Sequence, residues 1–473
     1  MYISCQTREG NLDEFFKYEN QPFPPALTDE TGSLRLGSKS DLLQCLVGDD
    51  DVDDDDENEN VHVEPANATA VILDGAAIVQ MLKPGISKTF GEYSEQVFLP
   101  YVKSQLQMAN RIDITWDRYF IDSLKGTARA KRGKGIRRRV IDSTSCPTNW
   151  ANFLRVDENK IEVFKLLTDS LIEADFIQRK ELVVTHGEQV VCVPNQDTAI
   201  LSPCNHEEAD TRMLLHASLA ATQGHNSITI RTVDTDVLVL AVMVAEKVPD
   251  IQQLWLAFGS GKNFRYIAAH RIKDEIGPQK SLALPMFHAL TGCDTVSAFA
   301  NHGKKSAWAT WECFPDLTDA LVALASCPGM ISMEVMNTIQ RFVVLMYDRA
   351  SQCTEINKAR KKIFARCNNV KRIPPTYDAL EQHARRATFQ GGFIWSNTLE
   401  KQPELPSACD WGWRKDDSGL YEPHWTNLPD ASKACKELIS CKCKKGCKKG
   451  CKCKKADLQC TQLCFCEGDC ERQ

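Results

Sequence analysis

Short apolar runs alternate with longer amphipathic stretches through the middle of the chain. From residue 68, the sequence Ala-Thr-Ala-Val-Ile-Leu-Asp-Gly predicts a buried strand that ends in a turn and leads into a helix. Similar strand patterns cover residues 112–116, 182–185, 227–233 and 253–257, and helical patterns cover residues 161–174 and 209–222. Because such alternation is typical of a parallel sheet flanked by helices, we predict an α/β fold, with a mostly helical part over residues 282–386.

The same patterns divide the chain into four parts. Residues 1–65 have few periodic apolar positions and include an acidic run at 49–59, so we predict a disordered acidic leader. Residues 66–390 form the predicted main domain, residues 391–434 a connector, and residues 435–473 a cysteine-rich module. The connector tryptophans at 395, 411, 413 and 425 could stack on bases, but packing in a core is their more common use.

Charge and cysteine usage narrow the class of protein. The net charge is −6, yet residues 441–473 hold nine Lys/Arg against four Asp/Glu, and a second basic cluster spans residues 125–139. Local basic clusters favour a polyanionic partner. Nine of the 21 cysteines lie in the last 33 residues, which favours metal thiolates in a reducing compartment. No membrane partner is expected, because the longest apolar run, 237–245, is far below the roughly 20 residues that span a bilayer.

Carboxylates recur at the predicted strand ends and helix starts. Seven share this placement: Asp74, Asp117, Glu208, Asp210, Asp234, Asp236 and Asp294. Because the carboxyl ends of parallel strands meet at one edge of a sheet, these side chains could share one site. A group of carboxylates repels itself unless cations neutralise it, and hard oxygen ligands suit Mg²⁺ or Mn²⁺. Two ions roughly 4 Å apart could activate a water and stabilise the leaving oxygen of a phosphodiester.

Each of these residues also has a simpler interpretation. Glu208 and Asp210 could be capping charges in the first turn of a helix. Asp234-Thr-Asp236 could be an ordinary turn after a strand. His206 and His216 are typical of surface or packed histidines. The order and local sequence of all seven acids together favour a shared site.

Five sequence blocks resemble those of the flap-endonuclease and exonuclease-1-like 5′ nuclease family, which has a PIN-like fold. They are Val-Ile-Leu-Asp74, Ile-Thr-Trp-Asp117, Glu208-Ala-Asp210, Val-Asp234-Thr-Asp236-Val-Leu and Gly-Cys-Asp294. In the family a helix-hairpin-helix that holds duplex DNA follows the last block, and residues 290–312 match that segment here. The family normally has a second glycine where this chain has Asn301-His302.

The resemblance implies a role for each residue. One ion would be held by Asp74, Asp117, Glu208 and Asp210. The other would be held by Asp234, Asp236 and Asp294. Lys125 and Arg129 would stabilise charge on the scissile phosphate, with a solvated basic loop as the alternative. Nucleic acid would contact a further set of residues: Lys131, Arg132, Lys134, Arg137, Arg138, Arg139, Gly303, Lys304 and Lys305.

The tail carries regularly spaced cysteines: Cys441, Cys443, Cys447, Cys451, Cys453, Cys460, Cys464, Cys466 and Cys470. Three tetrahedral zinc ions need twelve bonds, which nine thiolates supply when three of them bridge. The spacing is similar to the CXC repeat of the tesmin family and, less closely, to the CXC segment before some histone-methyltransferase SET domains. We therefore predict a small irregular module with three Zn²⁺ whose lysines contact phosphates. A metallothionein-like metal store is the alternative.

The leading hypothesis is a nuclear, Mg²⁺- or Mn²⁺-dependent, structure-specific nuclease. It would hydrolyse phosphodiester bonds in DNA by a two-metal mechanism, with the zinc module aiding contact with nucleic acid or chromatin. The rival hypothesis is a catalytically inactive, mobile-element-derived protein that binds nucleic acid or chromatin. A PIN-like RNase is a further alternative.

Overall fold

The computed structural model describes residues 12–48, 68–130, 135–174, 180–326, 329–367, 369 and 372–429, and in the tail residues 441, 443, 447, 448, 450–455, 460 and 466. Within these residues, no helix combines the length and apolar character needed to span a membrane.

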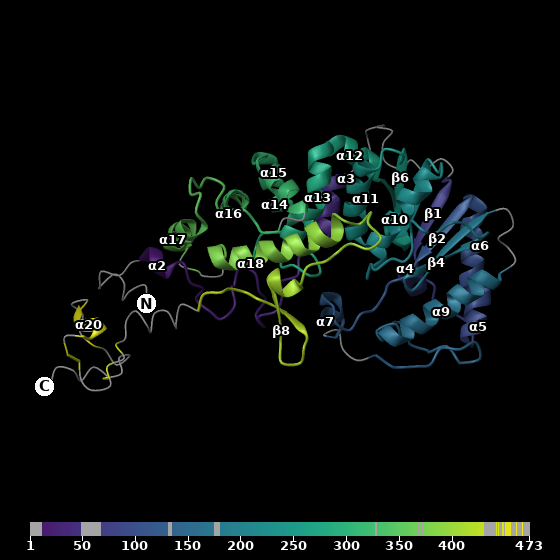
Figure 1. The fold of residues 1–473 in the computed structure, drawn as a ribbon, viewed down its shortest axis with the longest axis horizontal. Helices are drawn as coiled ribbons and strands as arrows, with labels where there is room; N and C mark the ends of the chain where they lie inside the picture. The colour runs from purple at the N-terminus through teal and green to yellow at the C-terminus, as the bar shows by residue number, and fades with distance from the viewer. Residues whose placement is uncertain are drawn as a thin grey trace.

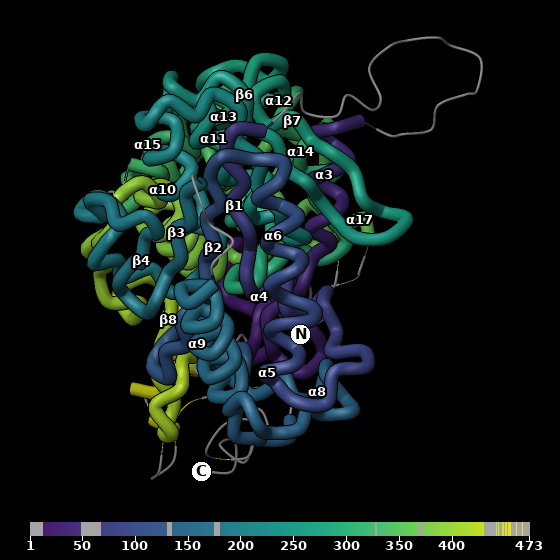
Figure 2. The backbone as a smooth tube through the Cα atoms, turned by 90° about the vertical axis from the view of Figure 1, so that its right-hand side faces the viewer, coloured from purple at the N-terminus to yellow at the C-terminus, as the bar shows by residue number. Residues whose placement is uncertain are grey.

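A seven-stranded sheet lies at the centre of the main domain (Figure 1, Figure 2). Its strands are β1 (Ala70–Asp74), β2 (Arg111–Thr115), β3 (Glu181–His186), β4 (Gln189–Val193), β5 (Ser227–Thr232), β6 (Gln253–Phe258) and β7 (Arg265–Ala268). Their order is β4-β3-β2-β1-β5-β6-β7, with five parallel strands between two antiparallel edge strands. The apolar strand β1 lies in the middle and is buried throughout, as expected for a strand covered on both faces.

The strands send alternate side chains into two separate cores. Ala70 and Ile72 of β1 belong to one core, whereas Val71 and Leu73 belong to the other. The first face is covered by α10 (Ala209–Thr222), α11 (Thr235–Lys247) and α12 (Ala269–Ile276). The second is covered by α4 (Gly75–Met81), α5 (Phe90–Tyr93), the π-helix η1 (Ser94–Phe98), α6 (Leu99–Met108) and α9 (Asp157–Glu173).

The C-terminal half of the main domain is mostly helical and packs on the α11 side of the sheet (Figure 1). Its helices are α13 (Pro278–Leu290), α14 (Lys304–Cys313), α15 (Leu317–Ala325), α16 (Met333–Tyr347), α17 (Ile356–Cys367), α18 (Tyr377–Thr388) and the π-helix η5 (Phe389–Trp395). Short elements complete the description: α2 (Leu12–Phe15), α3 (Ser40–Val47), α7 (Leu124–Ala130), α8 (Trp150–Phe153), η3 (Gly261–Asn263), η6 (Ala408–Asp410), the hairpin of β8 (Trp413–Lys415) and β9 (Tyr421–Pro423), and α20 (Lys452–Lys455).

The predicted fold class, a sheet flanked by helices with a mostly helical C-terminal part, is confirmed. The five predicted strands correspond to β1, β2, β3, β5 and β6, and the two predicted helices correspond to α9 and α10. The edge strands β4 and β7 were not predicted. The four connector tryptophans are all buried, at 2–6% exposure, so their packing interpretation is confirmed.

The prediction of a disordered leader is wrong for residues 12–48, whereas residues 1–11 and 49–67 lie outside the described residues. Leu42, Leu43 and Leu46 of α3 are buried in the larger core, because their spacing places them on one face of a helix. A buried ion pair between Glu19 and Arg360 ties the same segment to α17, with 3.5 Å between the charged atoms. The segment is therefore part of the folded domain.

The segment at residues 290–312 departs from the predicted contacts with nucleic acid. The loop at 291–303 joins α13 to α14, and Asn301 has a φ of 64°, a conformation that asparagine adopts more readily than most residues. The prediction is wrong for Lys304, which is 1% exposed. Lys304 is the first residue of α14. Its Nζ donates to the carbonyl of His288 at 2.8 Å and to the hydroxyl of Thr291 at 3.0 Å, so the ammonium group is held inside the protein.

We expect Leu42→Ala to lower the free energy of unfolding by about 2–5 kcal/mol, since truncation of a fully buried leucine leaves a cavity. The measurement is urea denaturation followed by circular dichroism. Leu36→Ala is the matched control, because Leu36 belongs to the same segment but is 73% exposed. Equal stabilities of the two variants would show that α3 does not belong to the core.

Candidate functional site

The candidate site lies where the connections of the sheet change direction. Strands β2 and β3 extend from one side of β1, whereas β5 and β6 extend from the other. Ligands of open parallel sheets bind at such a switch point, beyond the carboxyl ends of the strands. Asp74 is the last residue of β1, and Asp234 lies two residues after β5 ends. Both carboxylates therefore lie where the topology favours a ligand.

Helix starts fix the position of several carboxylates. Asp74 accepts a 2.9 Å hydrogen bond from a backbone N–H of α4, and Asp234 accepts one of 2.9 Å from α11. Glu208 precedes α10, but its side chain makes no capping hydrogen bond. Asp117, which follows β2, instead accepts a 2.9 Å bond from the N–H of Ala209 at the start of α10. Asp117, and not Glu208, therefore supplies the side-chain hydrogen bond at this helix start.

The predicted carboxylates converge on one location. Asp210, Asp234 and Asp236 can each place one oxygen within 4.8 Å of the others. Asp74 lies near enough to Asp117 and Asp234 for both charges to oppose its ionisation. This trio contains Asp210 from one of the predicted ion-binding sets and Asp234 and Asp236 from the other. Glu208 and Asp294 are connected to each other by ion pairs with one lysine.

That lysine is Lys125, in the first turn of α7. Its Nζ lies 2.5 Å from a carboxylate oxygen of Glu208 and 3.4 Å from one of Asp294. The side chain is 15% exposed. The structure thus places Lys125 inside the carboxylate cluster, where a phosphate group bound by the cluster would meet it.

A second lysine in the cluster was missed by the sequence reasoning. Lys39 immediately precedes α3, and its Nζ lies 2.8 Å from Asp236, 2.9 Å from Asp294 and 3.4 Å from Asp234. Burial opposes its charge, but the three carboxylates raise the pKa of Lys39 above its ordinary value. Lys39 is therefore a charged member of the site supplied by the segment that was expected to be disordered.

Three other carboxylates of the cluster, Asp74, Asp210 and Glu208, resist ionisation. Burial, together with the charge of Asp117, raises the pKa of Asp74 to about 7. Burial and the neighbouring carboxylates raise the pKa of Asp210 well above its ordinary value. Burial also raises the pKa of Glu208, against the opposing effect of Lys125. In all three carboxylates, burial is the main cause of the upward pKa shift, and neighbouring carboxylates add to it.

Asp236 and Asp294 behave in the opposite way. Burial alone would raise the pKa of Asp236, but His288, Lys39 and Lys125 lower it below its ordinary value. The His288 Nε2 to Asp236 Oδ1 distance is 2.8 Å, and the imidazole stacks on Trp395 with 5.5 Å between ring centroids. His288 is fully buried and therefore fixes the orientation of the Asp236 carboxylate.

The remaining predicted basic residues are dispersed. Arg129 pairs with Asp157 at 2.8 Å and Glu207 at 3.1 Å, beside the cluster. Arg137 and Arg139 are exposed, Arg138 is half-buried, and Gly303 and Lys305 are exposed at the start of α14. Lys131, Arg132 and Lys134 lie outside the described residues. The prediction for the two histidines is confirmed, because His206 and His216 are both packed inside the protein.

The donor set of the cluster fits a hard divalent cation. Asp210, Asp234 and Asp236 supply oxygen ligands, the type that Mg²⁺ and Mn²⁺ prefer, within a span that one ion can bridge. Two lysines face seven carboxylates, so negative charge remains in excess. A bound cation would relieve the repulsion that raises the pKa of Asp210.

The tail forms a separate thiol cluster. Cys441, Cys447, Cys460 and Cys466 have sulfur separations of 3.4–3.9 Å. A tetrahedral ion with bonds of about 2.3 Å to sulfur requires separations of roughly 3.8 Å, so this group fits one metal. Cys443, Cys451 and Cys453 complete two further groups of four, and Cys441 is common to all three. Cys464 and Cys470 lie outside the described residues.

No family model and no curated protein sequence matches the chain. Among solved structures, it is similar to a pseudo-enzyme form of the bacteriophage T5 D15 flap endonuclease in a product complex with DNA and metal ions. The match covers 70% of this chain and 97% of that chain, with 10% sequence identity and a TM-score of 0.32. This likeness is partial, so function is inferred below from the residues of the site.

We expect Lys39→Met to tighten binding of Mn²⁺ by about ten-fold or more, since it removes a positive charge that competes for Asp234, Asp236 and Asp294. Isothermal titration calorimetry measures the change. Lys17→Met is the matched control, because Lys17 is exposed and pairs only locally with Glu14 at 2.7 Å. Unchanged affinity in the Lys39 variant would contradict the contacts described here.

Proposed function

We propose that this chain is a divalent-metal-dependent nuclease that hydrolyses phosphodiester bonds in DNA. One observation carries the proposal: carboxylates from β1, α10, α11 and the loop after α13, of which Asp74 and Asp236 are buried, converge at the switch point of a parallel sheet and outnumber the lysines among them. A purely structural role does not account for this excess, because buried like charges destabilise a fold unless they are neutralised.

Asp210, Asp234 and Asp236 would hold one Mg²⁺ or Mn²⁺, and Asp74, Asp117 and Glu208 would supply oxygen ligands to a second. Two such ions supply an activated water and stabilise the leaving oxygen of an in-line displacement. His288 holds the Asp236 carboxylate in one orientation. Lys125 neutralises charge that develops on the phosphate, from its position between Glu208 and Asp294.

Arg137 and Arg139 are exposed, and the guanidinium of Arg137 pairs with Glu162. Arginine contacts to phosphates hold a strand without regard to its sequence, and their strength falls with salt. These residues position single-stranded or flapped DNA. Arg129, which is engaged by Asp157 and Glu207, stiffens the base of this region and does not contact the phosphate.

One observation favours a second candidate, a protein that binds nucleic acid without cutting it. Lys39 and Lys125 together already neutralise Asp234, Asp236, Asp294 and Glu208 in part. If these lysines replace the ions permanently, the fold is kept for binding alone. Calorimetry separates the two candidates, because a nuclease site takes up divalent ions and loses them in Asp236→Ala.

The tail supports nucleic-acid contact through a zinc cluster of three ions, with lysines between the cysteines facing phosphates or chromatin. The three overlapping groups of four cysteines support this assignment. The pKa of Cys451 is lowered to about 6 by hydrogen bonds from the backbone at Lys454, which favours the thiolate form that binds metals. With a basic tail of this kind, we place the protein in the nucleus.

With Mn²⁺, the purified protein is expected to cut a labelled 5′-flap DNA, and Asp236→Asn to slow cleavage by roughly 10²–10⁴-fold, since it removes a ligand worth several kcal/mol of transition-state stabilisation. The measurement is a single-turnover assay resolved on a denaturing gel. Asp274→Asn is the control, because Asp274 is 69% exposed on α12. Absence of cleavage by correctly folded wild-type protein would favour the binding candidate.

The chain should carry about three zinc ions, and Cys441→Ser should lose more zinc than any change at a cysteine outside the tail, because Cys441 belongs to every group of four. Mass spectrometry of the metal content measures zinc per chain. Cys409→Ser provides the comparison, since Cys409 is exposed and lies in the connector. A zinc content that is equal in both variants would exclude the cluster.

A further inference from the structure

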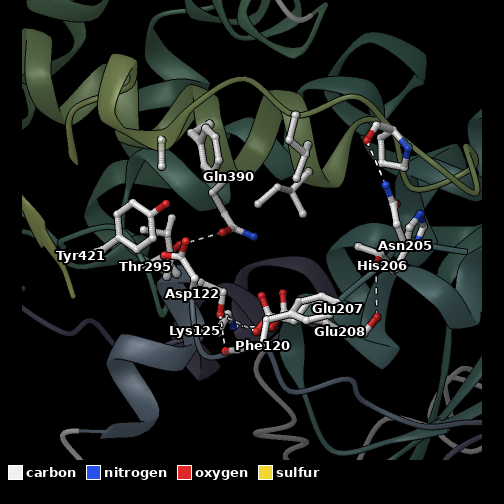
Figure 3. A pocket seen from close by; sticks show the side chains of 18 of the residues that line it. Phe120, Asp122, Lys125, Asn205, His206, Glu207, Glu208, Thr295, Gln390 and Tyr421 are labelled. Carbon is white, nitrogen blue, oxygen red and sulfur yellow. Dashed lines mark hydrogen bonds and ion pairs between the residues drawn. The ribbon is translucent and has the colours of Figure 1, made fainter. Parts of the chain in front are cut away.

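A cavity of about 290 Å³ opens beside the carboxylate cluster (Figure 3). Lys125 and Glu208 line its inner end and also belong to the cluster, so the two spaces adjoin. The opposite wall comes from η5 and the connector, which contribute Gln390, Ile394 and Tyr421. Its volume lies close to the lower end of the roughly 300–1,000 Å³ range of small-molecule pockets. No role in catalysis assigned above uses this cavity.

The cavity has flat apolar walls. Phe120 and Phe389 line it together with Tyr421 and with aliphatic side chains such as Ile394 and Leu405. Phe389 is 6% exposed, so it is fixed in place, whereas Phe120 is 37% exposed and lies at the rim. Aromatic walls of this kind favour a flat ligand that can stack.

One polar group inside the cavity has no partner. Gln390 is 2% exposed, and its amide oxygen accepts a 2.8 Å hydrogen bond from the hydroxyl of Thr295. Its amide nitrogen, Nε2, is buried without a hydrogen-bond partner among the described residues. Figure 3 shows the nitrogen turned away from Thr295 and into the cavity. A buried unpaired donor is costly, so its position favours a ligand that presents an acceptor there.

We propose that this cavity receives one unpaired nucleobase of the substrate strand, with Gln390 Nε2 donating to a ring carbonyl oxygen of that base. The inference rests on the proposed function, because it assumes that the adjoining cluster holds the phosphate of the same strand. Thr295 already donates to the amide oxygen of Gln390, so the group left unpaired is the donor Nε2. Thymine, guanine and cytosine present a carbonyl oxygen to such a donor, whereas adenine offers only ring nitrogens, so the site favours the first three bases.

The placement also explains how a strand would be oriented for cleavage. A base that stacks on an aromatic wall of this cavity would share the space with Lys125 and Glu208, which also belong to the carboxylate cluster. An extruded base must leave its stack, which unpaired or flapped strands allow at the lowest cost. The cavity would therefore select strands whose bases are already unpaired.

The test measures binding rather than cleavage. Fluorescence anisotropy in Ca²⁺ follows a labelled pentanucleotide of thymidine, its five single-abasic versions and a pentanucleotide of adenosine. For the wild-type protein, an abasic residue at one position should weaken binding by about ten-fold, as expected for loss of one stacked base. Gln390→Leu should weaken thymidine binding by about five-fold and adenosine binding by less.

One control variant and one further pocket variant distinguish a specific effect of Gln390 from a general effect of the substitution. Gln402→Leu makes the same change at an exposed glutamine and should bind like the wild type. Phe120→Ala, at the rim, should reproduce the loss of base dependence without disturbing the buried η5. Indifference of the wild type to every abasic position, or equal behaviour of Gln390→Leu and Gln402→Leu, would overturn the pocket.

The experiments distinguish failure of the proposed base pocket from failure of the proposed nuclease activity. Base-dependent binding without cleavage of flap DNA in Mn²⁺ would retain the pocket and remove the nuclease. Cleavage that depends on Asp236, with no base dependence at Gln390, would retain the nuclease and remove the pocket.

Discussion

The burial of more carboxylates than cations at one edge of the sheet is the constraint from which the rest of the site follows. Asp74, Asp117 and Asp234 reach this edge because β1, β2 and β5 are parallel neighbours, so the topology alone enforces their approach. Their repulsion must be offset. The protein supplies part of the compensation through Lys39 and Lys125, and the unequal pKa shifts of Asp74 and Asp236 show where that compensation stops. Asp210 lies on the less compensated side and forms a trio with Asp234 and Asp236, so a divalent ion bound there would supply positive charge to both sides.

The contacts of Lys39 are compatible with both candidate functions, the metal-dependent nuclease and the protein that binds nucleic acid without cutting it. A lysine that binds three carboxylates either marks a site whose ions have been replaced or provides a displaceable cation that gives way to metal and then contacts phosphate. Both interpretations use the same atoms, and they differ only in whether the free energy of metal binding exceeds that of the ion pairs. The segment that carries Lys39 is anchored independently, by Leu42 in the core and by the ion pair of Glu19 with Arg360. The attachment of the segment to the domain therefore does not depend on Lys39 alone.

The sequence was sufficient for the parts of the structure that depend on local pattern. Apolar runs predicted the central strands, and acids at their ends predicted the carboxylate cluster, because side-chain periodicity and strand direction are local properties. Contacts made across the fold could not be predicted in this way. Lys39 lies 195 residues from Asp234 in the sequence, and nothing in its neighbours indicates that contact. The apolar stripe of α3 was visible, but an eight-residue helix beside a long acidic run is a weak periodic signal.

The amide nitrogen of Gln390 lacks a hydrogen-bond partner, just as the carboxylate cluster lacks part of its compensating charge. The carboxylate cluster is short of positive charge, and the adjoining cavity is short of a hydrogen-bond acceptor. Lys125 and Glu208 belong to the cluster and also line the cavity. A nucleotide would meet both requirements at once, since its base carries an acceptor and its phosphate brings metal ions with it. Neither deficit alone identifies the ligand, because acidic clusters and apolar pockets are common features of proteins. The cluster and the cavity adjoin at Lys125 and Glu208. This proximity favours a polynucleotide strand over a free metal ion or a small apolar molecule.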